Sequence, residues 1–104
     1  MLFGKFLLEK KLLELPKMQK NYTPEQIADI LEAFLLQKLE EILTEEETEI
    51  ARRARNLPIP IGRRHIQAEY RQATAFETLI GWWHENDKNR LDFILKLLEK
   101  ELNF

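Results

Sequence analysis

Apolar residues recur every three or four positions along most of the chain, and no stretch alternates apolar and polar residues as a half-buried strand does. The spacing is clearest over residues 27–39 and again over residues 91–102. Only 3 of the 104 residues are glycine and 4 are proline, so few positions interrupt a helix. The pattern predicts an all-α fold. A chain of this length ordinarily forms one domain, so we expect residues 1–104 to be a single helical domain.

Start and stop signals along the chain predict about five helices. The first covers about residues 2–15 and ends before Pro16, which cannot continue a helix. The fourth covers about residues 67–83. The fifth follows Asn86 or Asp87, because either side chain can cap a helix.

Capping boxes mark the second and third helices. In this motif a threonine and a Glu or Gln three residues later exchange hydrogen bonds between side chain and backbone. Thr23 and Gln26 form the first box and predict a helix that reaches about residue 42. Thr44 and Glu47 form the second box and predict a helix that reaches residue 55 or 56. The segment 57–65 then carries two prolines, which favour an extended loop.

The composition excludes several kinds of site. The chain has no cysteine, which excludes a disulfide scaffold, a thiol nucleophile and a cysteine-ligated metal site. His65 and His84 are the only histidines, and neither has a ligand-type partner at helical spacing, so a zinc site is not predicted.

The Leu- and Phe-rich segment 1–15 contains five charged residues, too many for a signal peptide or a membrane-spanning helix. An amphipathic helix that lies on a membrane surface is the alternative for this segment. We therefore expect a protein without a membrane partner, located in the cytoplasm or in an organellar matrix or stroma.

The charges of the chain are unevenly distributed, although the net charge is only −2. Residues 40–49 hold six acids and no base, whereas residues 52–71 hold six arginines and one acid. An arginine presents a planar, bidentate fork that fits a phosphate, which a lysine does not. The cluster predicts a phosphate-binding surface, and the alternative is a solvated face that pairs with the preceding glutamates. Its members are Arg52, Arg53, Arg55, Arg63, Arg64 and Arg71, with His65 beside them.

Glu77 occupies an unusual position for an acid. At helical offsets of three and four it shares a face with Ala73, Thr74, Ile80 and Gly81, which are small or weakly polar. Such a face lets another helix approach closely, so we expect the carboxylate to be buried and therefore paired, neutral or bound to a cation. An internal salt bridge or hydrogen bond is one interpretation, and a metal ligand or general base is the other.

The sequence around Glu77 resembles a known family motif. The run Tyr70-Arg71-x-Ala73-Thr74-x-Phe76-Glu77-x-Leu79-Ile80-Gly81 is similar to the second acidic motif of the ribonuclease III fold. The resemblance is greatest to Mini-ribonuclease III, the form without a double-stranded-RNA-binding domain. Upstream, residues 43–47 and 52–56 are similar to the segment that precedes the motif in that family, and their order and spacing also fit.

The resemblance implies an all-helical homodimer in which each active site cleaves one strand of duplex RNA with Mg²⁺. The glutamate of the motif corresponds to Glu77, which would be a catalytic residue and a metal ligand. The arginine cluster and His65 would bind the phosphates of double-stranded or structured RNA. Ribosomal RNA processing or a ribonucleoprotein is the setting that the family implies.

The chain departs from the family in the first acidic motif, which reads roughly Gly-Asp-Ala-Val-x-Glu on an early helix. The best counterpart here is Gly4-Lys5-Phe6-Leu7-Leu8-Glu9, so Lys5 stands in place of the catalytic aspartate. Mg²⁺ requires anionic oxygen ligands, and an ammonium at this position would repel it or pair with Glu77. The sequence therefore predicts lost or weakened catalysis, with Mg²⁺ as a cofactor only if the domain is active.

Three hypotheses follow from these residues. The first is an RNA-binding ribonuclease III-like domain with lost or weakened catalysis, which makes it a pseudoenzyme. The second is an active endoribonuclease of Mini-ribonuclease III type, whose missing acid comes from Glu9 or from a partner chain. The third is a helical dimerisation or interaction module that binds no RNA.

Overall fold

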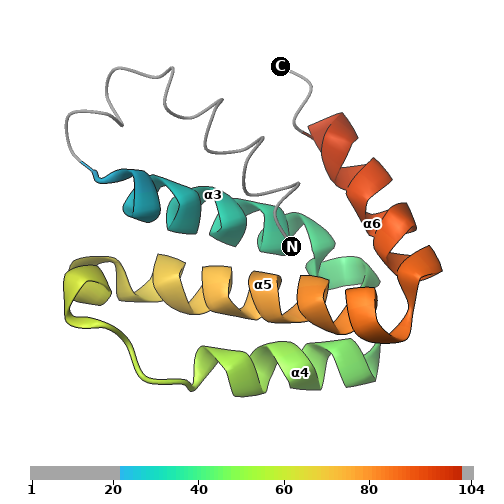
Figure 1. Cartoon of the computed structure of the whole chain (residues 1–104), viewed down its shortest axis with the longest axis horizontal. Coiled ribbons are helices and arrows are strands. Elements are labelled where there is room, and N and C mark those ends of the chain that lie inside the picture. The colour runs from blue at the N-terminus through green and yellow to red at the C-terminus, as the bar shows by residue number, and fades with distance from the viewer. Residues whose placement is uncertain (1–21, 102–104) are drawn as a thin grey trace.

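The computed structural model describes residues 22–101, and within this range it contains helices and loops but no strand (Figure 1). The predicted all-α fold is therefore confirmed, while the first predicted helix, at residues 2–15, lies outside the described residues. No helix in the described range is long and apolar enough to cross a lipid bilayer. The elements, in chain order, are α3 (Pro24–Leu39), the 3-10 turn η1 (Glu40–Ile42), α4 (Glu45–Arg55), the 3-10 turn η2 (Ile61–Ile66), α5 (Gln67–Asn86) and α6 (Lys88–Glu101).

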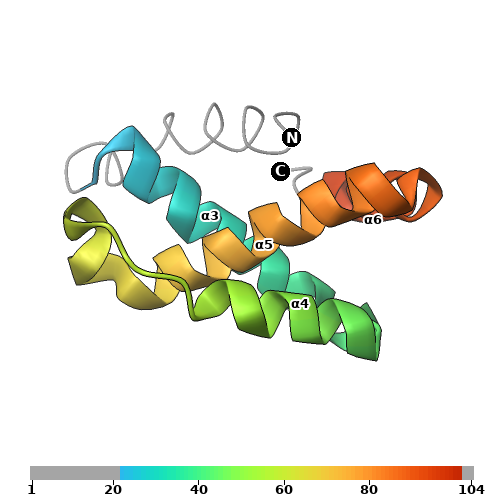
Figure 2. The same ribbon diagram turned by 60° about the horizontal axis from the view of Figure 1, so that its bottom comes forward.

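The α5 helix is the centre of the fold, since α3, α4 and α6 all pack against it. In Figure 1 it lies between α3 and α4, and Figure 2 shows that α3 crosses it obliquely. The α4 helix contributes only two alanines to the buried core, Ala51 and Ala54, so its backbone can approach α5 closely. The larger core residues are Leu31, Leu35, Leu36 and Leu39 of α3, Phe76, Leu79, Ile80 and Trp83 of α5, and Leu91, Ile94 and Leu98 of α6.

Both predicted capping boxes are present. The Thr23 backbone N–H donates to Gln26 Oε1 at 3.0 Å, and the Gln26 N–H donates back to Thr23 Oγ1 at 3.2 Å. The corresponding distances between Thr44 and Glu47 are 2.9 and 3.1 Å. Asp87 precedes α6 and its Oδ1 accepts from the Arg90 N–H at 3.0 Å, so the predicted start of the last helix is confirmed too.

Three boundaries differ from the prediction. The α3 helix ends at Leu39, and the 3-10 turn η1 continues to residue 42. The α5 helix runs to Asn86 instead of residue 83. The segment 57–65 was predicted to be extended, but its second half belongs to the 3-10 turn η2. At the start of this turn the Arg63 N–H donates to the Pro60 carbonyl at 3.0 Å. Prolines restrict only themselves and the residue before them, so the backbone is free to turn once Pro60 is passed.

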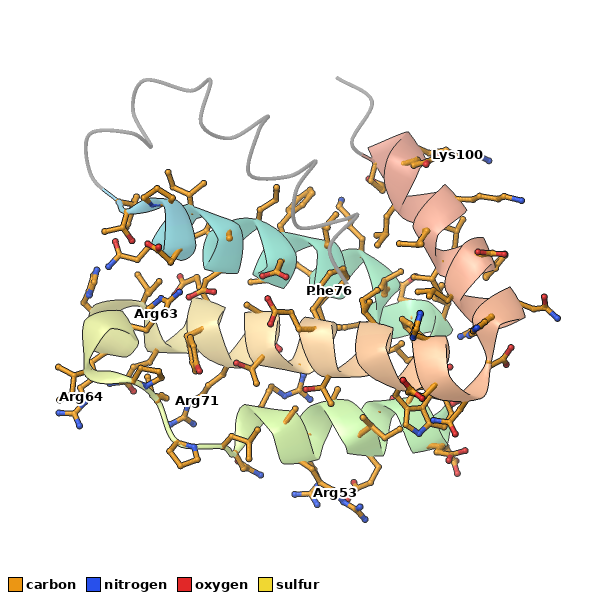
Figure 3. The ribbon with its side chains drawn as sticks, viewed as in Figure 1. Arg53, Arg63, Arg64, Arg71, Phe76 and Lys100 are labelled. Atoms are coloured by element: carbon orange, nitrogen blue, oxygen red, sulfur yellow. The ribbon has the colours of Figure 1, made fainter. Side chains whose placement is uncertain are left out.

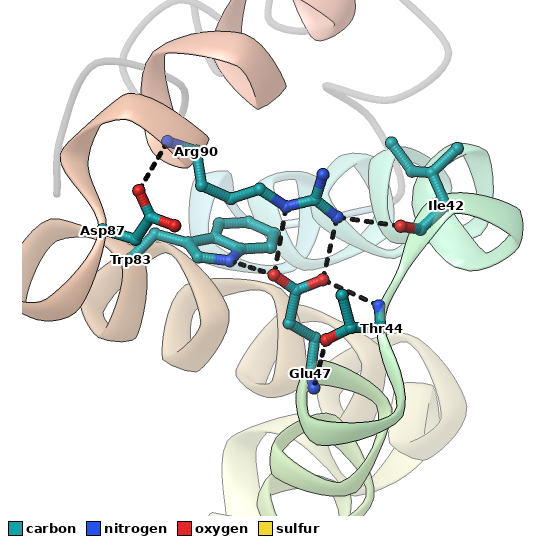
Figure 4. Close-up of polar contacts among 6 residues, drawn as sticks. All are labelled: Ile42, Thr44, Glu47, Trp83, Asp87 and Arg90. Carbon is teal, nitrogen blue, oxygen red and sulfur yellow. Dashed lines mark hydrogen bonds and ion pairs between the residues drawn. The ribbon is translucent and has the colours of Figure 1, made fainter.

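A buried carboxylate links three helices (Figure 4). The Glu47 side chain is 4% exposed, and its Oε2 accepts from Trp83 Nε1 at 2.6 Å. Arg90 donates to both carboxylate oxygens, from Nε at 3.1 Å and from Nη2 at 2.9 Å. Arg90 Nη2 also donates to the Ile42 carbonyl at 2.8 Å. These bonds join the start of α4 to the end of α5 and the start of α6. We call the side chains of Glu47, Trp83 and Arg90 the Glu47 clamp.

Burial of the carboxylate by itself raises the pKa of Glu47. Hydrogen bonds from Arg90, from the Thr44 backbone N–H and from Trp83 oppose this effect, together with the charge of Arg90, and they lower the pKa below its usual value. Glu47 is therefore ionised in the folded protein, and its negative charge is stabilised by the donors around it.

We expect Glu47→Gln to reduce the free energy of unfolding by about 2–4 kcal/mol, because it leaves the Arg90 guanidinium without its anionic partner. Urea denaturation followed by circular dichroism measures the difference. Glu46→Gln is the matched control, since Glu46 is exposed in the same helical turn and its replacement should change stability by no more than about 0.5 kcal/mol. Equal stabilities of the two variants would contradict the role of the clamp.

The stabilisation by Glu47 should also depend on pH. Because its folded pKa is lowered from 4.5, the unfolded chain takes up the proton first as the pH falls. The stability difference between wild type and Glu47→Gln should thus be complete above about pH 5.5 and shrink progressively below about pH 4.5. Denaturation of both proteins across this range tests the sign, and a difference that grows on acidification would refute it.

Candidate functional site

A cleft of about 250 Å³ opens where η2 and the first half of α5 meet α3. Its lining is mixed in charge: one arginine and two acids face it, together with a tyrosine and two small residues. The cleft therefore brings Glu77 together with Asp29 and Arg63, which sequence reasoning did not connect to it. The lining residues are Asp29, Arg63, Tyr70, Ala73, Thr74 and Glu77.

Glu77 is exposed at the edge of this cleft, so the expectation that its carboxylate is buried was wrong. The buried stripe of α5 follows Ala73, Phe76 and Ile80, and Glu77 lies on the flank of that stripe. A step of one residue along a helix turns the side chain by about 100°, which is enough to move Glu77 out of the core. The Thr74 hydroxyl, one turn before it, donates to the Tyr70 carbonyl at 2.9 Å and is satisfied within the helix.

Arg63 points into the cleft from η2 (Figure 3). Its Nε lies 3.3 Å from Asp29 Oδ2 of α3, and the Asp29 side chain is only 8% exposed. The guanidinium carbon lies 5.8 Å from the centre of the Tyr70 ring, within the range of a cation–π contact. One residue earlier, the Gly62 carbonyl accepts from Gln26 Nε2 at 3.2 Å, so α3 holds both the backbone and the side chain of this segment.

Sequence reasoning missed Asp29 as a site residue. The signal was present, because Asp29 is an acid between Ala28 and Leu31 in the apolar stripe of α3, where a buried charge needs a partner. The partner could not be named, since Arg63 is distant in sequence and the predicted loop gave no direction for its side chain.

The other arginines of the predicted cluster do not line the cleft. Figure 3 shows Arg53, Arg64 and Arg71 along the side of the molecule formed by α4, η2 and the lower edge of α5. We call this side the outer arginine face. Arg55 is half-buried, and its Nη1 donates to Gln72 Oε1 at 2.9 Å, which connects α4 to α5. The exposed members of the predicted cluster are Arg52, Arg53, Arg64, His65 and Arg71.

One of the preceding glutamates pairs with this face. Glu49 accepts from Arg52 Nη2 at 2.6 Å and from Arg53 Nε at 3.2 Å. Hydrogen bonds from Arg52 lower the pKa of Glu49 to about 2, assisted by the charges of both arginines. Arg52 and Arg53 therefore fit the alternative interpretation, in which the arginines pair with the preceding glutamates. Arg64 and Arg71 lie apart from Arg53 (Figure 3).

Comparison with known proteins identifies the family. The ribonuclease III domain matches residues 3–88 of the chain, which include α3 to α5 and the Glu77 cleft. The chain belongs to the ribonuclease III family. The resemblance read from the motif around Glu77 is therefore confirmed at the level of the family.

Curated relatives agree with this result. The chain is 43% identical over 67 residues to the Mini-ribonuclease 3 of Synechococcus sp., which covers 64% of this chain and 49% of the relative. It is 40% identical over 75 residues to the Mini-ribonuclease 3 of Synechocystis sp., covering 72% of this chain and 49% of the relative. The match to the Mini-ribonuclease 3 of Gloeobacter violaceus is 45% over 58 residues, covering 56% and 43%. The chain spans about half the length of these relatives. No solved structure matched it.

Among the described residues of this ribonuclease III domain, the cleft offers two acids to a metal ion, Glu77 and Asp29. Mg²⁺ is bound by several oxygen ligands in a near-octahedral arrangement. Among residues 22–101 no three acids or histidines lie close enough together to hold a metal ion. Asp29, the other acid of the cleft, is already ion-paired with Arg63. Lys5 and Glu9, the residues predicted to decide the fate of the first acidic motif, lie outside the described residues.

The Glu49 contacts predict a measurable titration. In the wild type, the Glu49 carboxyl should titrate with a pKa of about 2, followed by carbon NMR across acidic pH. Arg52→Gln should bring it back toward the ordinary value of 4.5, because the largest stabilising hydrogen bond is removed. Lys100→Gln, the same charge change at the far end of α6, should leave it unaltered (Figure 3). A wild-type Glu49 that titrates near 4.5 would show that the pair does not form in solution.

Proposed function

We propose that this ribonuclease III domain binds double-stranded or structured RNA through the outer arginine face, with cleavage lost or weakened. One observation carries the proposal: the exposed arginines of the outer arginine face lie on the same ribonuclease III domain as a cleft whose second described acid, Asp29, is ion-paired with Arg63. The family supports RNA as the ligand, and the name of the relatives, Mini-ribonuclease 3, supports a ribonuclease III-type function.

The chemistry of the outer arginine face suits a nucleic-acid backbone. Arginine forks bind phosphate oxygens in a bidentate manner, and a rigid helical scaffold holds them at fixed separations. Duplex RNA is read mainly through its shape and its phosphates, which requires cations in a row and few base contacts. Because each contacted phosphate releases a counterion, the affinity should fall steeply with salt.

Weak cleavage follows from the charge around Glu77. A single carboxylate binds Mg²⁺ poorly, and Asp29, the other acid of the cleft, is already engaged by Arg63. An active endoribonuclease is the rival function, with the missing acid supplied by Glu9 or by a partner chain. A helical interaction module without RNA binding is the other rival. A homodimer and a role in ribosomal RNA processing or in a ribonucleoprotein belong to the proposal as implications of the family.

Duplex RNA binding distinguishes these functions. We expect Arg64→Gln combined with Arg71→Gln to weaken binding about tenfold, and to reduce the slope of log K against log salt by about 2, one for each lost phosphate contact. Lys96→Gln combined with Lys100→Gln is the matched control, because it removes the same charge from exposed positions of α6. Equal losses in both double variants would indicate general charge attraction, and the absence of binding by the wild type would favour the interaction module.

A cleavage assay tests the catalytic half of the proposal. With Mg²⁺ and end-labelled duplex RNA, we expect the wild type to cut no faster than Glu77→Gln. Scission by the wild type that Glu77→Gln abolishes would establish the active endoribonuclease instead. Sedimentation of the wild type with and without RNA reports whether the domain is a dimer.

A further inference from the structure

We propose that Arg63 is a phosphate-binding residue inside the Glu77 cleft, and that Asp29 is the positioning residue that holds it there. Arg63 thus has a different task from the arginines of the outer face: it would bind the phosphodiester that lies next to Glu77. The inference deepens the proposed function and rests on it for the identity of the ligand as RNA.

The first observation is the unusual environment of Arg63. Its side chain is 24% exposed, whereas Arg52 and Arg53 are 57% and 75% exposed. It is the arginine that shares the cleft with Glu77. An arginine placed there for solubility alone would extend into solvent, as Arg64 does from the next position.

The second observation is that two contacts hold the guanidinium, and a third holds the backbone just before Arg63, before any ligand arrives. Asp29 Oδ2 faces its Nε at 3.3 Å, the Tyr70 ring lies beneath it at 5.8 Å, and Gln26 Nε2 binds the carbonyl of the preceding residue at 3.2 Å. An arginine that is already ordered loses less side-chain entropy when it binds a ligand, so its affinity for that ligand is higher. Gln26, whose side chain takes part in the capping box at the start of α3, therefore also holds η2 in place.

The third observation concerns the nitrogen of Arg63 that contacts Asp29. The ion pair is made through Nε. The remaining four N–H donors of an arginine are on Nη1 and Nη2, whose fork matches two oxygens of a phosphate. The cleft volume of about 250 Å³ corresponds to roughly eight water molecules at about 30 Å³ each, which is room for a phosphodiester group.

The proposal predicts an effect of Asp29→Asn on RNA affinity that is opposite to the effect that net charge alone would predict. Removing the negative charge of Asp29 should strengthen the attraction of the cleft for RNA if charge is all that matters. If Asp29 positions Arg63, Asp29→Asn weakens RNA binding despite the gain in net positive charge. Asp92→Asn, the same change on the exposed surface of α6, is the matched control and should alter affinity little.

The experiment combines affinities with arginine NMR on the full chain. We expect Arg63→Gln to weaken duplex RNA binding about tenfold or more, and Arg64→Gln only about two- to fivefold. Asp29→Asn should weaken it about three- to tenfold, with partial rescue by Asp29→Glu. Arg63→Lys keeps a cation beside Asp29 and should fold like the wild type, so its loss of affinity reports the lost fork and not lost stability.

The NMR probe is dimethyl phosphate, which makes the test independent of RNA. It should perturb the Arg63 Nη signals of the wild type and leave those of Asp29→Asn unperturbed. If duplex RNA binds but Arg63→Gln behaves as Arg64→Gln, the inference fails while the proposed function stands. If no RNA binds but dimethyl phosphate still perturbs Arg63, the inference about the cleft stands and the proposed function fails. If neither ligand perturbs Arg63, the inference is overturned.

Discussion

The fold depends on one buried carboxylate that three helices share. Glu47 caps the first turn of α4 and also accepts hydrogen bonds from Trp83 of α5 and Arg90 of α6. A buried charge without partners would be strongly unfavourable, but here four donors surround it and keep it ionised. The start of one helix and the packing of the other two therefore rely on the same side chain.

The contacts that fix α5 in the fold and the candidate site lie on different parts of this helix. The Glu47 clamp lies at the C-terminal end of α5 (Figure 4), whereas the cleft with Arg63 and Glu77 lies along its N-terminal half and middle. The small residues Ala51 and Ala54 let α4 lie close beside α5. Arginines from α4, η2 and α5, which are separate in sequence, thereby come to lie along one side of the domain (Figure 3).

Two kinds of arginine result, and they suit two tasks in the binding of RNA that we propose for this domain. Those of the outer face are exposed, and a cation in water attracts phosphates over a distance set by the ionic strength. The Arg63 guanidinium is held by Asp29 and Tyr70, and Gln26 holds the carbonyl of the preceding residue, an arrangement that favours a single defined contact. The same ion pair occupies the second acid of the cleft, which connects phosphate binding to the weakness of the proposed metal site.

The sequence by itself determined the starts of three helices and the family. Capping is a local interaction between residues three apart, so Thr23 and Thr44 placed the starts of α3 and α4 correctly. The start of α6 was predicted after Asn86 or Asp87, and Asp87 is the residue that caps it. The motif around Glu77 identified the ribonuclease III family because its residues are contiguous on one helix.

Only the tertiary structure decided which distant side chains meet. The sequence predicts Glu47 only as a capping residue. Its hydrogen bonds to Trp83 and Arg90 form because the end of α5 and the start of α6 pack against the start of α4. Asp29 reads as a lone acid, and Arg63 as one member of a charge cluster, until η2 folds back onto α3. The exposure of Glu77 was likewise decided by packing, because the direction of the core-facing stripe of α5 depends on where α3 and α4 lie against it. Periodicity defines the faces of a helix, but the partners that cover those faces are set by contacts distant in sequence.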